Sequence, residues 1–414
     1  MDKNLSFIFK GYNVDLKKGE ILFNFGIKGE ENIDFKERIS FNPIDRDIPQ
    51  EVLKPVLGGL MLILGISYWK TYCPKEIIIE SNFLTKKQAE FWNTVYTKGL
   101  GEFFFKNNID FRGLVQFPFV SEDESSSSIP FPRSDRYLLL LGGGKDSIVA
   151  AEVLKGQDKN FDILTVGTSD IQEDVARVMS KKPIVIKREL DPKLFELNGD
   201  KKVFNGHIPI SVVYGFLGLL ASVLYDYRFV IVGNERSANY GNLEYLGEIV
   251  NHQWSKSEEF ETLFREYIHN FVTPDISYSS ILRSLSEMEV TKKFVEHPEY
   301  FGVFSSCNTN FKISAPLRSG ELRRGKWCGK CAKCLFVFIM LAAYLPREKI
   351  IEIFGKDLFE DESLVSMLKK LAGLKDAKPF ECVGTPEEVS QAIAEIEKRG
   401  EFNDSVLMKS FKNK

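Results

Sequence analysis

Four short apolar runs, each followed by a polar loop, constrain the fold of this chain more than any other feature. They lie at 137–141, 161–166, 183–186 and 229–232, and helix-length segments separate them. Strands that are apolar on both faces and alternate with helices are typical of a parallel sheet covered on both sides. Ligands of such sheets bind outside the carboxyl ends of the strands. The sequence therefore predicts an α/β fold with a doubly wound parallel sheet and a ligand cleft at these loops.

The loop after the first run is rich in glycine. It reads Gly142-Gly143-Gly144-Lys145-Asp146-Ser147 and opens a helix. Glycines let the backbone turn tightly and bring N–H groups close to an anion, and the helix N-terminus adds its dipole. Ser147 can hydrogen-bond a phosphate oxygen. Asp146 would repel a phosphate unless it holds Mg²⁺, which bridges phosphate oxygens. We therefore predict a phosphate loop with a magnesium ligand, although the GxxxxGK[ST] spacing of a Walker A loop is absent.

This loop resembles the SGGxDS signature of the PP-loop ATP pyrophosphatases, which have a HUP-type fold, with Gly142 in place of the leading serine. The resemblance implies that the loop holds the β,γ-pyrophosphate of ATP while a substrate oxygen attacks the α-phosphorus. It places Gly167 and Thr168 near the adenosine. It also places Gly233, Asn234 and Glu235 near the nucleotide and the metal. The alternative is a glycine-rich turn that only joins a strand to a helix.

Four of the six cysteines suggest a metal site. Cys328, Cys331 and Cys334 form a CxxCxxC run, and Cys307 precedes them in SSCN. Clustered thiols of this kind indicate a metal in a reducing compartment rather than disulfides. Four thiolates suit a structural Zn²⁺ site, whose binding energy contributes to folding. An iron–sulfur cluster uses the same ligands, and buried thiols without metal are the third possibility. The arrangement is also similar to that of the PP-loop enzymes that form the deazaguanine nitrile, where it binds structural zinc.

A closer resemblance covers residues 137–360. The chain contains, in this order, NGHIPIS (205–211), GNERSAN (233–239), VNHQWSKSEEFE (250–261), ILRSLSE (281–287), SSCN (305–308), WCGKCAKCLFVF (327–338) and IFGKDLF (353–359). Together these segments resemble the UDP-N-acetylmuramoyl-L-alanyl-L-glutamate epimerase family, whose members act in peptidoglycan precursor synthesis. The implied partner is a small molecule, the UDP-muramoyl dipeptide, and the implied cofactors are ATP, Mg²⁺ and structural Zn²⁺.

The resemblance implies an ATP-dependent inversion of the terminal L-glutamate to D-glutamate. The glutamate α-carboxylate attacks the α-phosphorus of ATP and becomes an acyl adenylate, with release of diphosphate. Activation of the carboxylate makes the adjacent Cα–H more acidic, a base removes the proton, and an acid returns it to the other face. Water then cleaves the adenylate and releases AMP.

The residues that transfer the proton and bind the substrate are harder to assign. His252 lies at helical i,i+4 spacing from Lys256, whose charge would lower the pKa of His252 and favour a neutral base. Glu235 and His207 are further candidates for proton transfer. Phosphates and carboxylates of the substrate can be bound by cationic side chains, and the candidates are Lys256, His207, Arg283, Arg323 and Arg324. For each residue the alternative is a packing, capping or solvated role. Cys73 and Cys382 show no activating partner, so we do not expect a catalytic thiol pair.

The rest of the chain suggests two further parts. Residues 1–130 read as an α+β domain, with antiparallel strands in 1–45, helices over 50–108 and a strand at 76–80. A serine-rich linker at 121–135 precedes the PP-loop domain, which we expect over 131–345. Residues 346–414 read as a helical region with an amphipathic helix at 386–399 and a basic tail.

Charge and hydropathy limit the alternatives. The net charge of −3 and the pI of about 6.0 offer no global field for nucleic acid, which disfavours a tRNA-thiolating enzyme. The apolar stretch 56–69 is too short to span a bilayer, and 208–225 reads as a buried helix that leads into a strand. We therefore expect a cytoplasmic enzyme with no nucleic-acid or membrane partner. The main competitor is a PP-loop ligase or nitrile or amide synthase of the deazaguanine type, and a non-enzymatic scaffold is the last alternative.

Overall fold

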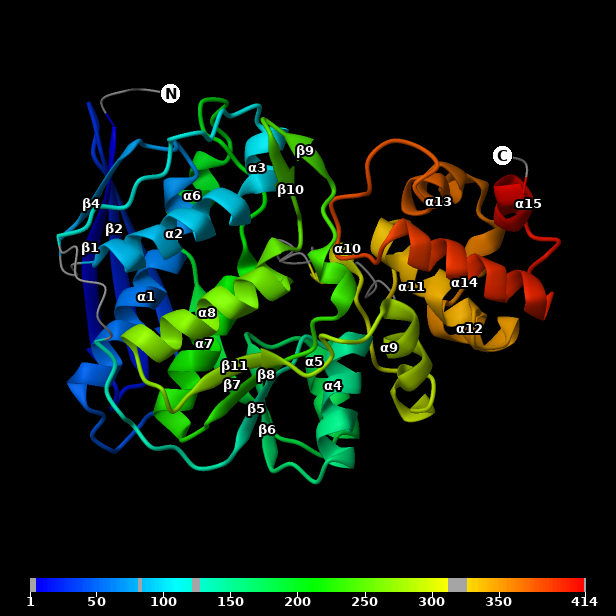
Figure 1. Ribbon diagram of the computed structural model, residues 1–414, viewed down its shortest axis with the longest axis horizontal. Helices are drawn as coiled ribbons and strands as arrows, with labels where there is room; N and C mark the ends of the chain where they lie inside the picture. Colours follow the sequence, from blue (N-terminus) through cyan, green and yellow to red (C-terminus); the bar gives the residue numbers. More distant parts are fainter. Residues whose placement is uncertain (1–4, 81–83, 121–126, 312–325, 413–414) are drawn as a thin grey trace, which may run out of the picture.

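A nine-stranded sheet forms the centre of the computed structural model, which describes residues 5–80, 84–120, 127–311 and 326–412 (Figure 1). Its strand order is β11-β8-β5-β6-β7-β3-β2-β1-β4. The strands are β1 (Ser6–Asp15), β2 (Glu20–Lys28), β3 (Ile33–Ser40), β4 (Glu76–Ile79), β5 (Tyr137–Leu140), β6 (Phe161–Val166), β7 (Ile184–Glu189), β8 (Phe229–Val232) and β11 (Ser277–Ser280). All pairs from β11 to β7 are parallel. The fold is therefore mixed α/β, with a large sheet in which the half that carries the glycine-rich loop is parallel.

The parallel half of the sheet is apolar on both faces, as its four apolar runs predict. Leu138 and Val230 belong to one hydrophobic cluster, whereas their neighbours Leu139 and Ile231 belong to another. The first cluster includes side chains of α1 (Gln50–Trp69), α7 (Ile210–Tyr225) and α8 (Glu258–Phe271). The second includes side chains of α4 (Lys145–Gly156) and α5 (Asp170–Val178). Helices therefore cover both faces, because alternate strand residues point to opposite sides.

The N-terminal strands extend this sheet rather than forming a separate one. β1, β2 and β3 are antiparallel, as expected, and β3 pairs with β7 of the parallel half. Buried Glu37 on β3 forms an ion pair with Arg188 on β7 at 2.6 Å. The helices of this part are α2 (Lys86–Gly99), α3 (Gly101–Lys106) and, after β7, α6 (Pro192–Leu197). The sheet thus contains strands from both sides of position 130 in the sequence. The domain boundary expected at this position stays a prediction.

Helix α1 is the candidate for a membrane span. It has 20 residues, and its length and composition would allow it to cross a bilayer. The expectation that this stretch is too short was wrong, because the helix begins at Gln50, before the apolar run. However, 89% of its most apolar window is buried inside the protein. Added Cβ atoms at Gly59 and Gly65 would lie 2.4 Å from Phe216 and 2.3 Å from Phe9, so α1 is closely packed against α7 and β1.

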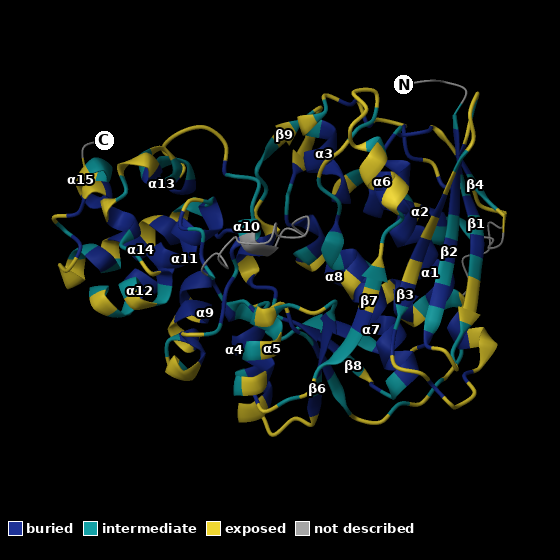
Figure 2. Ribbon diagram, turned by 180° about the vertical axis from the view of Figure 1, so that it is seen from behind, coloured by how far each residue is buried: buried dark blue, intermediate teal, exposed yellow. Residues whose placement is uncertain are grey.

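The C-terminal part is helical, as predicted, and surrounds one buried helix. All residues of α11 (Ala332–Ala342) are buried, and Figure 2 shows this helix in dark blue among its neighbours. The amphipathic helix α14 (Pro386–Arg399) begins with a capping box made by Thr385 and Glu388. The basic tail contains a further helix, α15 (Val406–Lys412), which the sequence analysis missed. The other elements of the second half are the hairpin β9 (Leu243–Tyr245) and β10 (Glu248–Val250), and the helices α9 (Glu287–Phe294), α10 (Asn308–Phe311), α12 (Arg347–Phe354) and α13 (Val365–Leu371).

Candidate active site

The glycine-rich loop has the predicted strand–loop–helix setting. It joins β5 to α4, and Gly144 is the N-cap of the helix. Gly143 has a φ of +85°, and an added Cβ there would lie 2.8 Å from the Ile171 side chain. At Gly144 it would lie 2.6 Å from Ser306 Oγ, whereas at Gly142 it would meet no described atom within 4 Å. The loop is therefore packed tightly on one side and open at Gly142, where its first residue is exposed.

The loops after β6 and β8 lie beside this loop. An added Cβ at Gly233 would be 2.6 Å from the carbonyl oxygen of Asp146, so only glycine permits this approach. Gly167 has a φ of +74° and precedes exposed Thr168. In the same loop region, Gln172 Nε2 donates to the carbonyl oxygen of Leu141 at 3.1 Å. The structure thus brings together the ends of three strands, in the way expected for a parallel sheet.

A cluster of opposite charges lies at the start of α4. The Lys145 side chain is buried and forms ion pairs with both Asp146 and Glu287. Burial opposes the charge of Lys145, but the two carboxylates outweigh it and raise its pKa, so that it stays an ammonium. Burial likewise opposes ionisation of Asp146, but Lys145 and the more distant Lys333 hold the pKa of this carboxyl below its usual value.

One carboxylate of this cluster is accessible to solvent. The Asp146 side chain is 27% exposed and therefore reachable from the open side of the loop. The charges of Asp146 and Glu235 both act on Glu287, so these two carboxylates lie within electrostatic range of Glu287. Oxygen ligands of this type are the ones that Mg²⁺ prefers. Asp146 and Glu235 were expected from the sequence, whereas Glu287 was not.

A second group of polar side chains surrounds Cys382. Lys256 Nζ donates to Cys382 Sγ at 3.3 Å. The charge of the His252 imidazolium also acts on this thiol, while its Nδ1 hydrogen-bonds buried Glu102. Burial opposes the thiolate, but Lys256 and His252 lower the pKa of Cys382 to about 5. The expectation that Cys382 lacks an activating partner was therefore wrong, because its partners come from segments that are distant in the sequence.

His252 differs from its predicted state. Residues 252–256 do not form a continuous α-helix, and only Trp254–Lys256 makes a short 3-10 turn. Lys256 therefore turns its ammonium towards Cys382. Burial opposes the charge of His252, but the interactions with Cys382 and Glu102 raise its pKa to about 9. The expectation of a neutral His252 was wrong, and the imidazolium is the form present at neutral pH.

His207 is the neutral member of this group. Its ring lies 4.4 Å from that of His252, measured between centroids, and its Nδ1 is 3.6 Å from Glu102 Oε2. Burial and the charge of His252 lower the pKa of His207 to about 3, although Glu102 opposes this effect. Burial opposes the charge of Glu102 in turn, but the hydrogen bond from His252 and the nearby charges lower its pKa to about 2.

The residues predicted to bind the substrate or the nucleotide differ in what the structure shows of them. Arg283 donates to the Glu261 carboxylate at 2.7 Å, and to the carbonyl oxygens of Glu235 at 3.1 Å and Lys256 at 2.7 Å. Most of its donors are therefore used inside the protein, where they hold the two segments that carry Glu235 and Lys256. Arg323 and Arg324 lie outside the described residues. Asn234 is buried, and its backbone exchanges hydrogen bonds with the Ser280 hydroxyl on β11. Ser147 Oγ donates to the Gly144 carbonyl at 3.0 Å.

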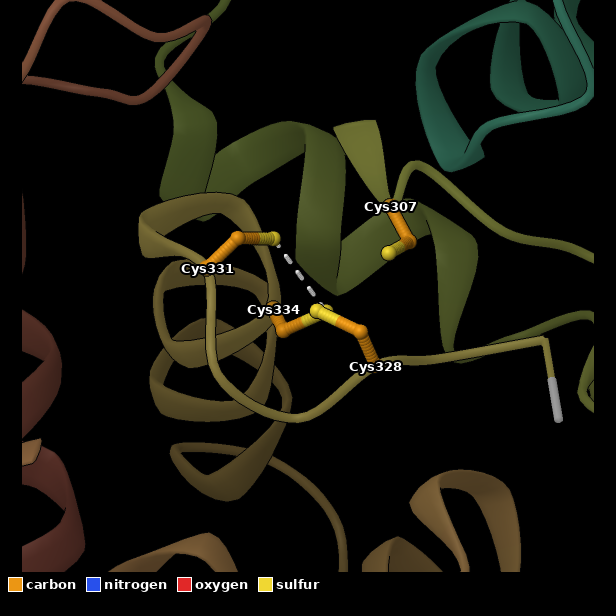
Figure 3. A group of neighbouring side chains, drawn as sticks. All are labelled: Cys307, Cys328, Cys331 and Cys334. Atoms are coloured by element: carbon orange, nitrogen blue, oxygen red, sulfur yellow. Dashed lines mark hydrogen bonds between the residues drawn. The ribbon is translucent and has the colours of Figure 1, made fainter. Parts of the chain in front are cut away.

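The four clustered cysteines converge (Figure 3). All four Sγ atoms lie within 4.8 Å of one another. Cys334 Sγ is 3.7 Å from that of Cys328 and 3.5 Å from that of Cys331. Zinc–sulfur bonds of about 2.3 Å in a tetrahedron give sulfur separations of about 3.8 Å. The donor set and its spacing therefore fit a closed tetrahedral zinc site.

Local geometry holds the cysteine run in shape and links it to the glycine-rich loop. Gly329 has a φ of +62°, and the N–H of Lys330 donates to Cys328 Sγ at 3.4 Å. On the other side of the cluster, Ser305 N–H donates to the Gly143 carbonyl at 3.2 Å, and Ser305 Oγ accepts from Cys307 N–H. The segment that ends in Cys307 thus supports the glycine-rich loop.

Three residues of the site carried no signal that was read as functional. Glu102 lies in an apolar stretch that reads as helix, and Cys382 lies beyond the cysteine run in a short loop. Glu287 is the last residue of the ILRSLSE segment, where it reads as the acidic first residue of a helix. Only the tertiary structure brings these residues to the loop, since each is far in the chain from its partners.

Comparison with known proteins identifies the family. The family description "MurL N-terminal domain" matches residues 1–281, and "MurL C-terminal domain" matches residues 303–414. A relative from Xanthomonas oryzae pv. oryzae is 37% identical over 87% of this chain and 78% of its own length. A relative from Micromonospora sp. is 33% identical over 98% of this chain and 90% of its own length. A relative from Salinispora tropica is 32% identical over 97% of this chain and 87% of its own length. All three are named UDP-N-acetyl-alpha-D-muramoyl-L-alanyl-L-glutamate epimerase. The chain therefore belongs to the MurL family, and it is an enzyme of the epimerase kind.

Proposed function

We propose that this chain inverts the terminal L-glutamate of UDP-N-acetylmuramoyl-L-alanyl-L-glutamate to D-glutamate, a step in peptidoglycan precursor synthesis. The observation that carries the proposal is the shared name of three relatives that align with most of this chain. The small-molecule substrate follows from that name. A cytoplasmic location and the lack of nucleic-acid and membrane partners stay predictions.

We further propose that ATP drives the inversion through an acyl adenylate, in a fold of the PP-loop type. The support is the glycine-rich loop between β5 and α4, which is open at Gly142, and the three strand ends that meet beside it. Main-chain N–H groups at a helix N-terminus bind phosphate well. In this proposal Gly143, Gly144 and Ser147 bind the pyrophosphate part, and Gly167, Thr168, Gly233 and Asn234 line the nucleotide.

The carboxylates at the loop are the proposed Mg²⁺ ligands. Asp146 is the first choice because it is partly exposed beside Gly144, and Glu235 is the second. Bound Mg²⁺ would neutralise phosphate charge. Lys145 offsets the repulsion between the Asp146 and Glu287 carboxylates by pairing with both. Without this buried ammonium the two carboxylates would repel each other, and one would be protonated.

The reaction requires activation of the glutamate α-carboxylate before the α-proton is removed. An α-proton beside a free carboxylate is a very weak acid, because its removal places two negative charges on adjacent atoms. In an acyl adenylate the carboxylate no longer carries its own negative charge, so removal of the α-proton leaves only one. The group around Cys382 and His252 lies within electrostatic range of the loop, since the charges of both Cys382 and Asp146 act on Lys256. We also propose that Cys307, Cys328, Cys331 and Cys334 hold a structural Zn²⁺.

The test is incubation of the purified enzyme with the UDP-linked L-Ala-L-Glu substrate, ATP and Mg²⁺. Chiral analysis of glutamate after hydrolysis should find D-glutamate, and AMP and diphosphate should form with it. Ammonia added to the same reaction tests the competing formation of an amide or nitrile. Inversion without ATP would contradict the activation step, and an amide product would contradict the epimerase assignment.

A further inference from the structure

We propose that Cys382 is a catalytic residue of the epimerisation, whose Sγ removes the Cα proton from one face of the activated glutamate. This inference rests on the proposed function, but its evidence is the geometry around the thiol. Three elements that are far apart in the chain supply its surroundings: α3, the segment 252–256, and the loop between α13 and α14. Figure 1 shows that loop reaching from the C-terminal helices towards β9 and α3.

The thiol is placed between two cationic groups. Lys256 Nζ donates to Sγ at 3.3 Å, and the charge of the His252 imidazolium acts on the same thiol. Glu102 in turn accepts from His252 Nδ1, which fixes the ring and favours its charged form. A thiol between an ammonium and an imidazolium is held as a thiolate, which is the reactive form of cysteine. The three side chains therefore act on one atom.

The backbone around Cys382 is held from several sides. Lys333 Nζ donates to the Cys382 carbonyl, and Lys333 N–H donates to the Glu381 carboxylate at 2.8 Å. Gln253 Nε2 donates to the Val383 carbonyl at 3.1 Å. Asn242 Nδ2 donates to the Pro379 carbonyl at 2.9 Å. The position of the thiol is thus determined before any substrate binds, as proton transfer requires.

A second cysteine in the same chain shows what an inert thiol looks like here. Cys73 is buried, and its S–H donates to the Lys70 carbonyl at 3.5 Å. Burial raises the pKa of Cys73 to about 12. Cys382 is only half-buried and has the opposite shift, to about 5. Packing alone accounts for Cys73, but it does not account for the ammonium, the imidazolium and the carboxylate that are arranged around Cys382.

The thiol is also linked to the glycine-rich loop through the charge of Lys256. The charges of Cys382, Glu235 and Asp146 all act on Lys256, so this lysine lies within electrostatic range of the thiol and of the carboxylates at the loop. A glutamate whose α-carboxylate is joined to a phosphate at the loop has its Cα one bond from that carboxylate. In the proposal, its Cα–H faces Sγ.

The proton and electron balance is complete without a redox partner. The Cα–H bond breaks, its electron pair enters the enolate of the adenylate, and an S–H bond forms at Cys382. A second protonated side chain, an ammonium or imidazolium on the opposite face, then supplies the proton for the new Cα–H bond. Exchange with water removes the proton from Sγ and restores the second acid. Lys256 and His252 are positioning residues in this scheme, because they act through the thiolate.

The experiment compares wild-type enzyme with Cys382→Ser and the control Cys73→Ala. Each UDP-linked diastereomer, with L- or D-glutamate, is incubated with ATP and Mg²⁺ in D₂O. We expect Cys382→Ser to lower epimerisation at least 100-fold, the scale of a lost acid–base group, while AMP is still released. Deuterium incorporation should vanish from the diastereomer whose Cα–H faces Sγ and persist in the other. Cys73→Ala should behave as wild type.

Alkylation of wild-type enzyme by iodoacetamide provides a test that needs no substitution. Modification of Cys382, located by peptide mass spectrometry, should remove exchange from the same diastereomer and leave AMP release intact. Normal epimerisation by Cys382→Ser would overturn the inference, and so would equal loss of exchange and AMP release. A glutamyl thioester found on Cys382 would also overturn it, since the thiol would then act as a nucleophile. If the wild-type enzyme gives no D-glutamate, the proposed function itself fails.

Discussion

Replacement of Glu102 by glutamine tests the charge arrangement beneath the proposed proton-transfer group. Glu102→Gln keeps the volume of the side chain and removes its charge. The pKa of Glu102 falls from its usual 4.5 to about 2 because the hydrogen bond from His252 and nearby charges outweigh burial. Since each pKa unit corresponds to about 1.4 kcal/mol, the ionised carboxylate stabilises the fold by about 3 kcal/mol at neutral pH. The side chain is 5% exposed, so solvent screens this little.

The effect should depend on pH in a defined direction. The contribution of Glu102 is present above its usual pKa of 4.5 and is lost as the pH falls through about 2. The pKa of His252 is raised from 6.5 to about 9, so its contribution is present below 6.5 and is lost as the pH rises through about 9. The loss of stability in Glu102→Gln should therefore be largest between pH 4.5 and 6.5 and smaller at high pH.

Urea unfolding followed by tryptophan fluorescence at pH 6 and above pH 9 measures this difference. Lys106→Gln is the matched control, because Lys106 also pairs with Glu102 but its side chain is 52% exposed. That variant should lose less than about 1 kcal/mol, as exposed ion pairs do. A loss below about 1 kcal/mol in Glu102→Gln, or an equal loss at both pH values, would refute the reasoning.

Three further predictions concern the other parts of the site. Asp146→Asn should lower diphosphate release from ATP at least 100-fold with little change in fold, because it removes the proposed Mg²⁺ ligand but little volume. The control is Asp158→Asn, just beyond the other end of α4. Normal turnover by Asp146→Asn would contradict the metal role. Metal analysis should find about one zinc per chain, and Cys331→Ser should lose both the zinc and much stability, whereas active enzyme without metal would exclude the site. Iodoacetamide should alkylate Cys382 nearly as fast at pH 6 as at pH 8, because its pKa is lowered to about 5; a rate that rises steeply over this range would contradict a thiolate at neutral pH.

The parts of the fold that sequence patterns predicted are those with a strong local signal. The strands at 137–140, 161–166 and 229–232 are apolar on both faces, and helix Pro386–Arg399 has both a capping box and an amphipathic face. β11 was missed because its sequence, SYSS, is polar and short, and it is recognisable as a strand only through its pairing with β8. The hairpin of β9 and β10 has three-residue strands, which are too short for a clear alternation of apolar and polar residues.

The candidate site also has parts with a local sequence signal and parts without one. The residues of the glycine-rich loop and of the cysteine run are contiguous or nearly so, and their spacing predicted that the loop opens a helix and that the thiols cluster. The environment of His252 could not be predicted, because the assumption of a helix placed Lys256 against it, whereas the backbone turns Lys256 towards Cys382. Glu102 and Cys382 are each more than a hundred residues from His252 in the chain, as the separation of 150 residues for Glu102 shows. Contacts of this length leave no local pattern.

The site lies where the two family domains meet, and this has a consequence for how its parts depend on each other. Asp146, His252 and Lys256 belong to the first matched region, whereas Lys333 and Cys382 belong to the second. The cysteine cluster connects both halves: the Cys307 segment supports Gly143 through Ser305, and Lys333, next to Cys334, holds the backbone of Cys382. A metal at these thiolates would therefore fix the distance between the phosphate loop and the thiol. Because a displacement of about 1 Å can cost a large factor in rate, loss of that metal should impair epimerisation, which needs both the loop and the thiol, more than it impairs ATP cleavage, which does not need the thiol.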